Sequence, residues 1–382
     1  MMRIVIAPDK FKGSLPAAEV AAAITAGLRA VCPAAELITI PVADGGEGTV
    51  DAAVAAGFER VPVTAAGPTG DPVQASYARR GEVAVVELAC VCGLARLPGG
   101  RREPLTASSF GAGEVLRAAL EAGARRIILG VGGSASTDGG AGMLQALGAR
   151  VLDAQGEQIG LGLGGGAALR DVASLDLAGL HPALRAAVII LAADVDNPLT
   201  GPDGAAEVYG PQKGASPGEV AVLADGLRRW AAVVAAATGA DWSQAPGSGA
   251  AGGVGFAARA VLAAQSRPGI GLVLELAGFD AALAGADLVI TGEGSLDRQS
   301  LAGKAPVGVA RAAARLGIPV VAVAGRSTLT AAELAAAGIA AVYPLSGLEP
   351  DPERCRAEAG PLLRRVGQMI ARDRLAEAVT RG

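Results

Sequence analysis

Six short segments of this chain combine glycine with hydroxyl or charged side chains, each after an apolar run or a turn. They lie at residues 7–14, 43–49, 130–140, 193–198, 209–215 and 291–304. In open α/β sheets, ligands bind in the crevice beyond the carboxyl ends of the strands. Several polar loops at such ends therefore indicate a binding region more strongly than any one of them does alone.

The segment GVGGSASTDGG at 130–140 predicts a cradle for nucleotide phosphates. It follows the apolar run RIIL and leads into a helical stretch, whose start favours an anion. Gly132 and Gly133 allow a ligand to approach the backbone closely, and Ser134 and Thr137 offer hydroxyl groups. A tight turn with capping hydroxyls is the alternative. The segment is not a Walker A loop, because no Gly-Lys-Ser/Thr sequence ends it.

Lysines in these segments could hold a substrate carboxylate or a phosphoryl group. They are Lys10 and Lys12 after the first apolar run, Lys213 in the sequence PQKGA, and Lys304 in the last segment. A lysine in a turn or at the start of a helix can also be an ordinary solvated charge. The sequence leaves this alternative open for each of them.

Carboxylates in the same loops could bind Mg²⁺ or accept a proton. The candidates are Asp9, Asp44, Asp138, Asp194, Glu293 and Asp297. Asp138 lies beside the predicted phosphate cradle, where a carboxylate suits Mg²⁺ better than proton transfer. Glu293 and Asp297 are candidate Mg²⁺ or substrate groups. For Asp194, which follows the apolar run AVIILA, the alternative is a capping role before a turn.

The composition argues against several other classes of protein. His181 is the only histidine and the four cysteines form no CxxC pair, so neither a zinc site nor a Ser-His or Cys-His catalytic pair is expected. The formal net charge is −4 and there is no basic run, so nucleic acid is not an expected partner. Two GxGxxG matches, which begin at Gly160 and Gly247, follow no convincing strand, and this argues against an NAD-dependent enzyme.

The chain also lacks the features of an exported or membrane protein. The first apolar run is too short for a signal peptide, because Asp9 and Lys10 interrupt it. No apolar stretch approaches the length of a membrane span. We therefore expect a cytoplasmic protein with no membrane partner.

The order of the elements predicts an α/β fold with two domains, which is the usual outcome for 382 residues. Two strand–loop–helix units open the chain, and the last third contains three strand candidates, DLVITG, PVVAVAG and AAVYPL. We expect residues 1–65 and 270–382 to share one parallel sheet in a Rossmann-like domain. Residues 66–269 should form a second α/β domain inserted into it, with the active site in the cleft between the two.

The inserted stretch carries its own signals. The sequence VQASYARRGEVAVVELA predicts a hairpin that turns at Arg80 and Gly81. RIILGV and AVIILAA predict buried strands, and Leu223, Leu227 and Trp230 mark one face of a long helix.

Taken together, the motifs resemble the bacterial glycerate kinase family. APDKFKGS, PVADGGEGT, GVGGSASTDGGAGML, AADVDNPL, YGPQKGA and ITGEGSLDRQS with GKAP appear in that family's order between residues 7 and 306. The resemblance implies a kinase that uses ATP and Mg²⁺ to phosphorylate (R)-glycerate, usually to 2-phosphoglycerate. A kinase for another small hydroxy acid, or one that forms 3-phosphoglycerate, is the alternative, and a non-catalytic nucleotide-binding protein is a more distant one. A homodimer is left open.

With this reading each candidate residue receives a role. Phosphoryl transfer to an alcohol needs an acceptor for the hydroxyl proton, and kinases commonly supply an aspartate. We expect Asp194 to be that base, because it follows a buried strand and should be held rigidly. The expected roles are catalytic for Asp194, Asp44 and Lys10, nucleotide-binding for Gly132, Gly133, Ser134, Thr137 and Lys213, substrate-binding for Asp9, Lys12, Arg298 and Lys304, and Mg²⁺-binding for Asp138, Glu293 and Asp297.

Overall fold

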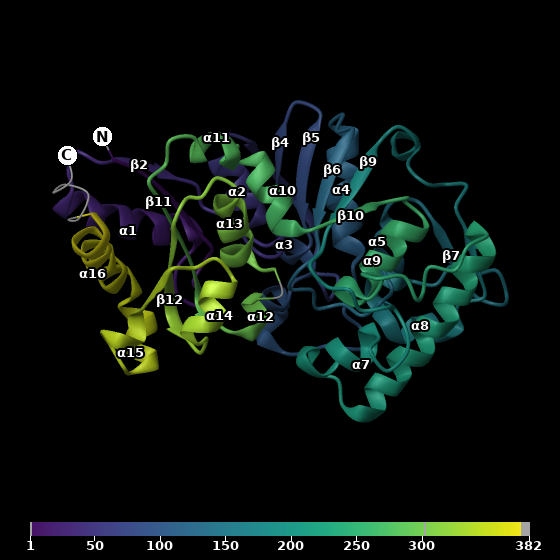
Figure 1. Cartoon of the computed structure of the whole chain (residues 1–382). Coiled ribbons are helices and arrows are strands. Elements are labelled where there is room, and N and C mark those ends of the chain that lie inside the picture. Colours follow the sequence, from purple (N-terminus) through teal and green to yellow (C-terminus); the bar gives the residue numbers. More distant parts are fainter. Residues whose placement is uncertain (1, 302, 376–382) are drawn as a thin grey trace. The chain divides into compact units, whose positions relative to one another are not determined.

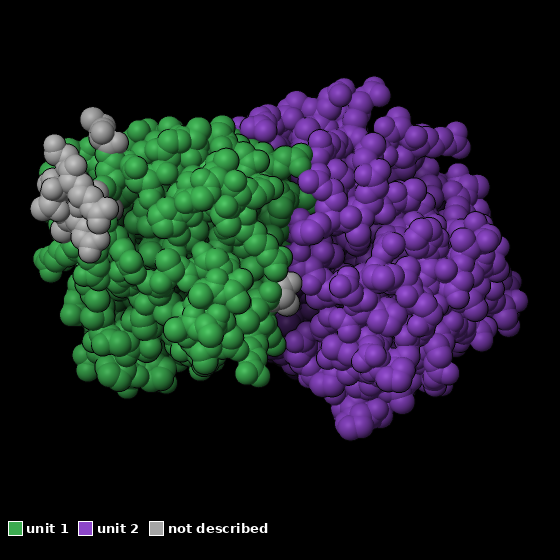
Figure 2. Space-filling model, viewed as in Figure 1, with its two compact units in different colours: residues 1–44, 51–56, 270–382 green, residues 45–50, 57–269 purple. Residues whose placement is uncertain are grey.

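The computed structural model describes residues 2–301 and 303–375, which fold into two compact units. Figure 2 colours the units separately: unit 1 comprises Met1–Asp44, Asp51–Ala56 and Ile270–Gly382, and unit 2 comprises Gly45–Val50 and Gly57–Gly269. Both units mix helices and strands, and unit 2 is inserted into the sequence of unit 1. The predicted α/β fold class is confirmed.

Unit 1 contains a five-stranded parallel sheet in the order β13-β12-β11-β1-β2. Its strands are β1 (Arg3–Pro8), β2 (Glu36–Thr39), β11 (Leu288–Leu296), β12 (Val320–Ser327) and β13 (Ala341–Pro344). The chain proceeds from β1 to one edge of the sheet and from β11 to the other. The neighbouring strands β1 and β11 therefore form the switch point at which ligands bind in sheets of this kind.

Helices cover both faces of this sheet (Figure 1). Ile4 and Ile6 of β1 pack beneath α1 (Ala17–Val31) and α16 (Ala359–Ile370). Val5 and Ala7 face the opposite way and pack with α10, α11 and α13. This alternation is what a strand buried on both sides requires. The remaining bounds are α2 (Thr49–Ala55), α10 (Gly269–Leu276), α11 (Phe279–Leu283), α12 (Arg298–Leu301), α13 (Ala305–Ala314), α14 (Ala331–Ala336) and α15 (Pro352–Ala357).

Unit 2 contains a six-stranded mixed sheet in the order β10-β9-β6-β5-β4-β3. Its strands are β3 (Glu59–Ala66), β4 (Pro72–Arg80), β5 (Val83–Glu87), β6 (Arg126–Gly130), β9 (Val188–Ala192) and β10 (Gln265–Arg267). The last four of these are parallel, whereas β3 and β4 are added antiparallel. The hairpin predicted around Gly81 is confirmed as the β4–β5 pair.

The chain first leaves unit 1 earlier than the expected boundary at residue 65. It enters unit 2 at Gly45, returns at Asp51, and enters again at Gly57. The physical reason is the pairing of β3, which runs antiparallel to β4 along its whole length, so residues 59–66 extend the sheet of unit 2.

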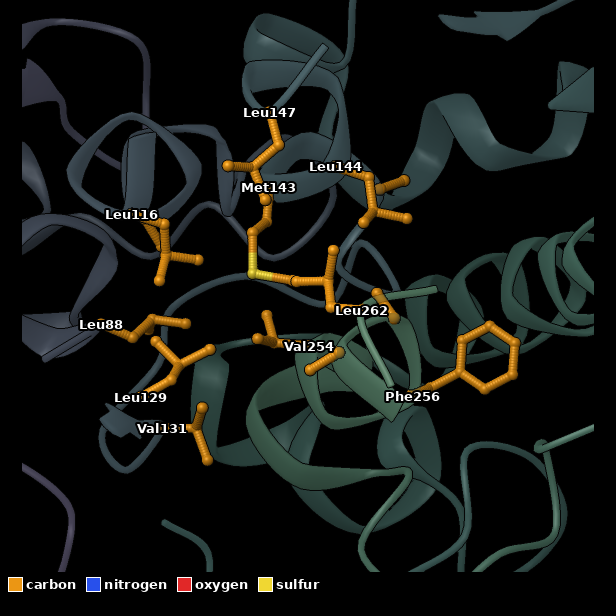
Figure 3. Packing of buried hydrophobic residues seen from close by; sticks show 14 of the residues in the cluster. Leu88, Leu116, Leu129, Val131, Met143, Leu144, Leu147, Val254, Phe256 and Leu262 are labelled. Carbon is orange, nitrogen blue, oxygen red and sulfur yellow. The ribbon is translucent and has the colours of Figure 1, made fainter. Parts of the chain in front are cut away.

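A large hydrophobic core lies within unit 2. Figure 3 shows the side chain of Met143 among those of Leu116, Leu129 and Leu144, so that β6 and two helices meet at this point. The predicted long helix is confirmed as α8, with Trp230 buried. The other bounds are α3 (Ala89–Cys92), α4 (Phe110–Glu121), α5 (Ala141–Ala146), α6 (Leu161–Gly164), α7 (Ala205–Tyr209), α8 (Pro217–Thr238), α9 (Ala250–Ala260), β7 (Arg150–Leu152) and β8 (Ser174–Asp176).

The polar 130–140 loop connects β6 and α5, and both of these elements contribute side chains to the hydrophobic core. Met143 and Leu129 anchor the two ends of the 130–140 loop in the core.

Among the described residues, no helix has the length and apolar character to cross a bilayer.

In unit 1, α1 and α16 cross with their backbones in contact. A Cβ atom at Gly367 would lie 2.5 Å from the carbonyl oxygen of Ile24 and 3.1 Å from the Cα atom of Gly27. Small residues at a crossing point permit such an approach, because any side chain would force the helices apart.

We predict that Gly367→Ala lowers the free energy of unfolding by about 1–3 kcal/mol, the usual cost of overpacking. Gly360→Ala, in the same helix, is the matched control, because its Cβ atom would meet nothing closer than 4.0 Å. In both variants alanine favours the helix over glycine by about 1 kcal/mol, so a difference in stability between them reports the contact at Gly367. Chemical denaturation of both variants measures the difference. Equal stability of the two variants would contradict the close crossing.

Candidate active site

The carboxyl ends of β5, β6 and β9 carry a layer of loops in unit 2. A Cβ atom at Gly130 would lie 2.6 Å from the carbonyl oxygen of Gly45, and one at Gly132 would lie 2.6 Å from the Cα atom of Gly46. Two backbones that approach so closely leave no room for a side chain between them. Glycine thus brings the 43–49 and 130–140 loops, which the sequence predicted separately, into direct contact.

Lys213 lies beneath the 130–140 loop and is 2% exposed. Its ammonium donates hydrogen bonds to the Ser134 hydroxyl at 3.0 Å, to the carbonyl oxygen of Ser136, and to the Thr137 hydroxyl at 3.5 Å. A single buried cation therefore orients both predicted hydroxyl groups from inside the protein.

Burial lowers the pKa of Lys213 to about 7, while the nearby Asp138 carboxylate acts in the opposite direction. The ammonium is consequently close to its own pKa at neutral pH. A negative charge brought to the loop would favour the protonated form. A protonated Lys213 would therefore place positive charge beneath the loop, on its buried side.

Asp138 is fully buried, and both of its carboxylate oxygens are engaged within unit 2. One accepts hydrogen bonds from the backbone N–H and the hydroxyl of Ser109 at 2.7 and 2.8 Å, and the other from the N–H of Gly140 at 3.2 Å. Burial raises the pKa of Asp138, and these contacts, together with the N–H of Gly142, lower it. The carboxylate thus occupies the start of α5, where a phosphate was expected, and its geometry favours a structural role over Mg²⁺ binding.

A second glycine-rich segment supports the loop, although its sequence pattern indicated no role. The N–H of Gly139 donates to the carbonyl oxygen of Gly252 at 2.9 Å, and a Cβ atom at Gly253 would lie 2.6 Å from the Cα atom of Gly139. Trp230 adds a hydrogen bond from its indole N–H to the carbonyl oxygen of Gly139 at 3.0 Å. The glycines after Pro246 were the only signal in the sequence, and they do not identify the surface that they contact.

Asp194 lies two residues beyond the end of β9 and is exposed. Its carboxylate accepts a hydrogen bond from the N–H of Gly269 at 2.9 Å, which ties the loop after β9 to the residues after β10. The expected rigid position at a strand end is therefore replaced by a loop position fixed through this hydrogen bond.

In unit 1, charged residues gather at the carboxyl ends of β1 and β11, the switch point of the sheet. Asp9 directly follows β1, is 6% exposed, and donates from its backbone N–H to the carbonyl oxygen of Gly292 at 2.8 Å. One carboxylate oxygen of Asp9 accepts a hydrogen bond from the Lys10 N–H at 2.6 Å and lies 3.7 Å from the Lys10 ammonium.

These groups influence one another electrostatically. Burial raises the pKa of Asp9 to about 7, Lys10 lowers it, and Asp44 and Glu293 raise it further. Burial also raises the pKa of Glu293, against the effects of Ser300 and Lys304. One cluster in unit 1 thus comprises Asp9, Lys10, Asp44, Glu293, Asp297 and Lys304.

The cluster in unit 1 contains groups that suit a divalent cation. One carboxylate oxygen of Glu293 is buried and accepts no hydrogen bond from the described residues. A cation beside Glu293, Asp44 and Asp9 would relieve their mutual repulsion. Within residues 2–301 and 303–375, no three His, Cys, Asp or Glu side chains enclose a metal by themselves. Mg²⁺ usually takes one or two carboxylates together with substrate phosphates, so the residues fit a cation that arrives with a nucleotide.

Three of the residues predicted to bind substrate or Mg²⁺ are either exposed or engaged in a local contact. Lys12 is exposed on the turn after β1. Arg298 is exposed and lies 3.4 Å from Glu333. Asp297 accepts a hydrogen bond from the Gln299 N–H at 2.9 Å, which is a local capping contact. These positions leave Lys12 and Arg298 without a buried setting for a substrate carboxylate.

The raised pKa of Asp9 predicts a pH-dependent stability. Between about pH 4 and pH 7 the folded protein retains a proton on Asp9 that the unfolded chain has lost, so the parent becomes less stable as the pH rises through this range. Asp9→Asn cannot ionise. Its free energy of unfolding should exceed that of the parent by an amount that grows from about pH 4 to about pH 7 and then stays constant. Urea unfolding without divalent cations measures this, and a difference independent of pH would contradict the buried setting of Asp9.

Comparison with known proteins agrees with the resemblance seen in the motifs. The model of the glycerate kinase family matches residues 4–375. A glycerate kinase from Bacillus subtilis (strain 168) is 47% identical over 327 residues, which is 85% of each chain. A glycerate 2-kinase from Escherichia coli (strain K12) is 45% identical over 346 residues, which is 90% of each chain.

A solved structure extends the similarity to three dimensions. The crystal structure of a protein from Salmonella typhimurium LT2, provisionally assigned as glycerate kinase 2, superposes with a TM-score of 0.84 at 43% identity and covers 100% of both chains. Sequence and fold therefore agree over the full length, and this chain belongs to the glycerate kinase family.

Proposed function

We propose that this chain transfers the γ-phosphoryl group of ATP to the 2-hydroxyl of (R)-glycerate, giving ADP and 2-phosphoglycerate in the presence of Mg²⁺. Membership of the glycerate kinase family supports the reaction class. The name of the Escherichia coli relative, glycerate 2-kinase, favours the 2-hydroxyl over the 3-hydroxyl. A cytoplasmic location and a homodimer stay predictions.

The observation that carries the proposal is the buried ammonium of Lys213 beneath a glycine-rich loop. Phosphates are recognised by backbone N–H groups and by fixed positive charge. Gly132 and Gly133 leave the loop backbone without side chains, while Lys213 holds the hydroxyls of Ser134 and Thr137. We assign the triphosphate of ATP to this loop.

The cluster of unit 1 is assigned to the reacting groups. The glycerate hydroxyl oxygen forms a bond to the γ-phosphorus, the bond from that phosphorus to the β,γ-bridging oxygen breaks, and the hydroxyl proton passes to a carboxylate. Lys10 and Lys304 are suited to the substrate carboxylate and the transferring group. Mg²⁺ held by Glu293 with Asp44 would neutralise phosphate charge. For the proton we retain Asp194 as the first candidate and Asp44 as the second.

An assay for ADP release tests the proposed activity. We predict turnover with (R)-glycerate, ATP and Mg²⁺ at millimolar concentrations, and loss of turnover when EDTA removes the cation. Phosphorus NMR of the product should show phosphate on the 2-oxygen. (S)-Glycerate and (R)-lactate are the comparison substrates for stereochemistry and for the second hydroxyl. Absence of ADP formation with (R)-glycerate would refute the proposal.

Asp194→Asn tests the identity of the base. Asparagine keeps an oxygen that can accept the Gly269 N–H but removes the charge. If Asp194 accepts the proton, kcat should fall by roughly 10²–10⁴-fold, the usual contribution of a general base, with little change in nucleotide affinity. Retained kcat together with weaker Mg²⁺-ATP binding would instead make Asp194 a metal ligand and Asp44 the base.

A further inference from the structure

Glu87 is a buried acidic residue at the end of β5 that the sequence motifs did not include. It is 4% exposed, although nothing in its sequence context, the apolar run VAVVELA, indicates a use for a charge. One carboxylate oxygen accepts hydrogen bonds from the N–H groups of Gly48 and Val50, each at 3.1 Å. Buried carboxylates are rare unless they satisfy specific donors, and these two donors lie in one short loop.

The loop that Glu87 holds is the excursion of residues 45–50 into unit 2. Its other side is fixed by the close backbone approach of Gly45 and Gly46 to the end of β6. The Thr49 hydroxyl closes the loop on itself with a hydrogen bond to the carbonyl oxygen of Gly46 at 2.6 Å. The loop is thus held from two directions, and Glu87 supplies the side-chain contact.

The loop presents a single exposed carboxylate. Gly45, Gly46, Thr49 and Val50 are buried, whereas Glu47 is exposed. Asp44, a member of the cluster of unit 1, directly precedes the loop in the chain. The position of the 45–50 backbone therefore sets the position of Glu47. It also sets the position of the peptide bond that joins Gly45 to Asp44.

We propose that Glu87 is a positioning residue for phosphoryl transfer: by holding the N–H groups of Gly48 and Val50, it fixes the loop that follows Asp44, the carboxylate proposed above for Mg²⁺ or the hydroxyl proton. This inference rests on the proposed kinase function. Displacement of a reacting group by about 1 Å can cost roughly 10²-fold in rate. Loss of the Glu87 contact should therefore affect kcat and the response to Mg²⁺ more than it affects the fold.

Glu87→Ala tests the proposal, with Glu114→Ala as the matched control. Glu114 also lies in unit 2 and accepts a backbone N–H, that of Ala66 at 2.6 Å, but at the end of β3. Both variants should lose thermal stability. Only Glu87→Ala should lower kcat by roughly 10–100-fold and raise the Mg²⁺ concentration for half-maximal activity. Glu87→Gln should restore most of the loss, because its amide oxygen can accept both N–H groups.

Hydrogen exchange of the 45–50 segment adds a readout that is independent of activity. Exchange should accelerate there in Glu87→Ala and remain unchanged in Glu114→Ala. Retained kcat and Mg²⁺ response in Glu87→Ala, alongside reduced stability, would overturn the positioning role. Should Glu87→Ala fail to fold, Glu87→Asp carries the same test, since it keeps the charge but shortens the reach, and unchanged kcat would again overturn the role. An inactive parent protein would refute the proposed function itself, which distinguishes the two failures.

Discussion

Direct contact between backbone segments at glycine is the constraint on which the arrangement of unit 2 depends. The 45–50 loop, the loop after β6 and the segment around Gly252 touch without side chains between them. A larger residue at Gly132 would force the loops apart, since its Cβ atom would lie 2.6 Å from the Cα atom of Gly46. The 56 glycines of this chain are therefore concentrated, in part, where polar loops must share one edge of a sheet.

This dense backbone packing explains why the buried side chains Lys213 and Asp138 in unit 2 have specific hydrogen-bond partners. With little side-chain volume at the strand ends, hydrogen bonds from Lys213 and to Asp138 hold the loop in shape. Both groups are buried. Burial lowers the pKa of Lys213 and raises that of Asp138, which in each case favours the neutral form. A buried charge is tolerated only when its neighbours satisfy it. The network consequently specifies one conformation of the loop.

Unit 1 uses charge in the opposite way. Asp9 and Glu293 are buried at the switch point, and burial, with a smaller contribution from neighbouring carboxylates, raises the pKa values of both. Such an arrangement is costly in an isolated protein and becomes favourable when a cation joins it. Unit 2 thus offers positive charge and backbone donors, whereas unit 1 offers negative charge.

From the sequence alone came the fold class, most strands of the two large sheets and the loops that carry the polar residues, whereas the edge strands β3 and β10 were not predicted. Those predictions were possible because apolar runs and glycine-rich turns are local patterns, and because the motifs occur in the order of one family. The sequence placed Asp138 with the metal ligands, and it did not single out Glu87 or Gly252, because their roles depend on partners far away in the chain. Glu87 lies 37 residues from Val50, and Lys213 lies 79 residues from Ser134. Only the tertiary structure decides which buried charge meets which backbone N–H, since burial and pairing, rather than residue type, determine whether a carboxylate binds a ligand or holds a loop.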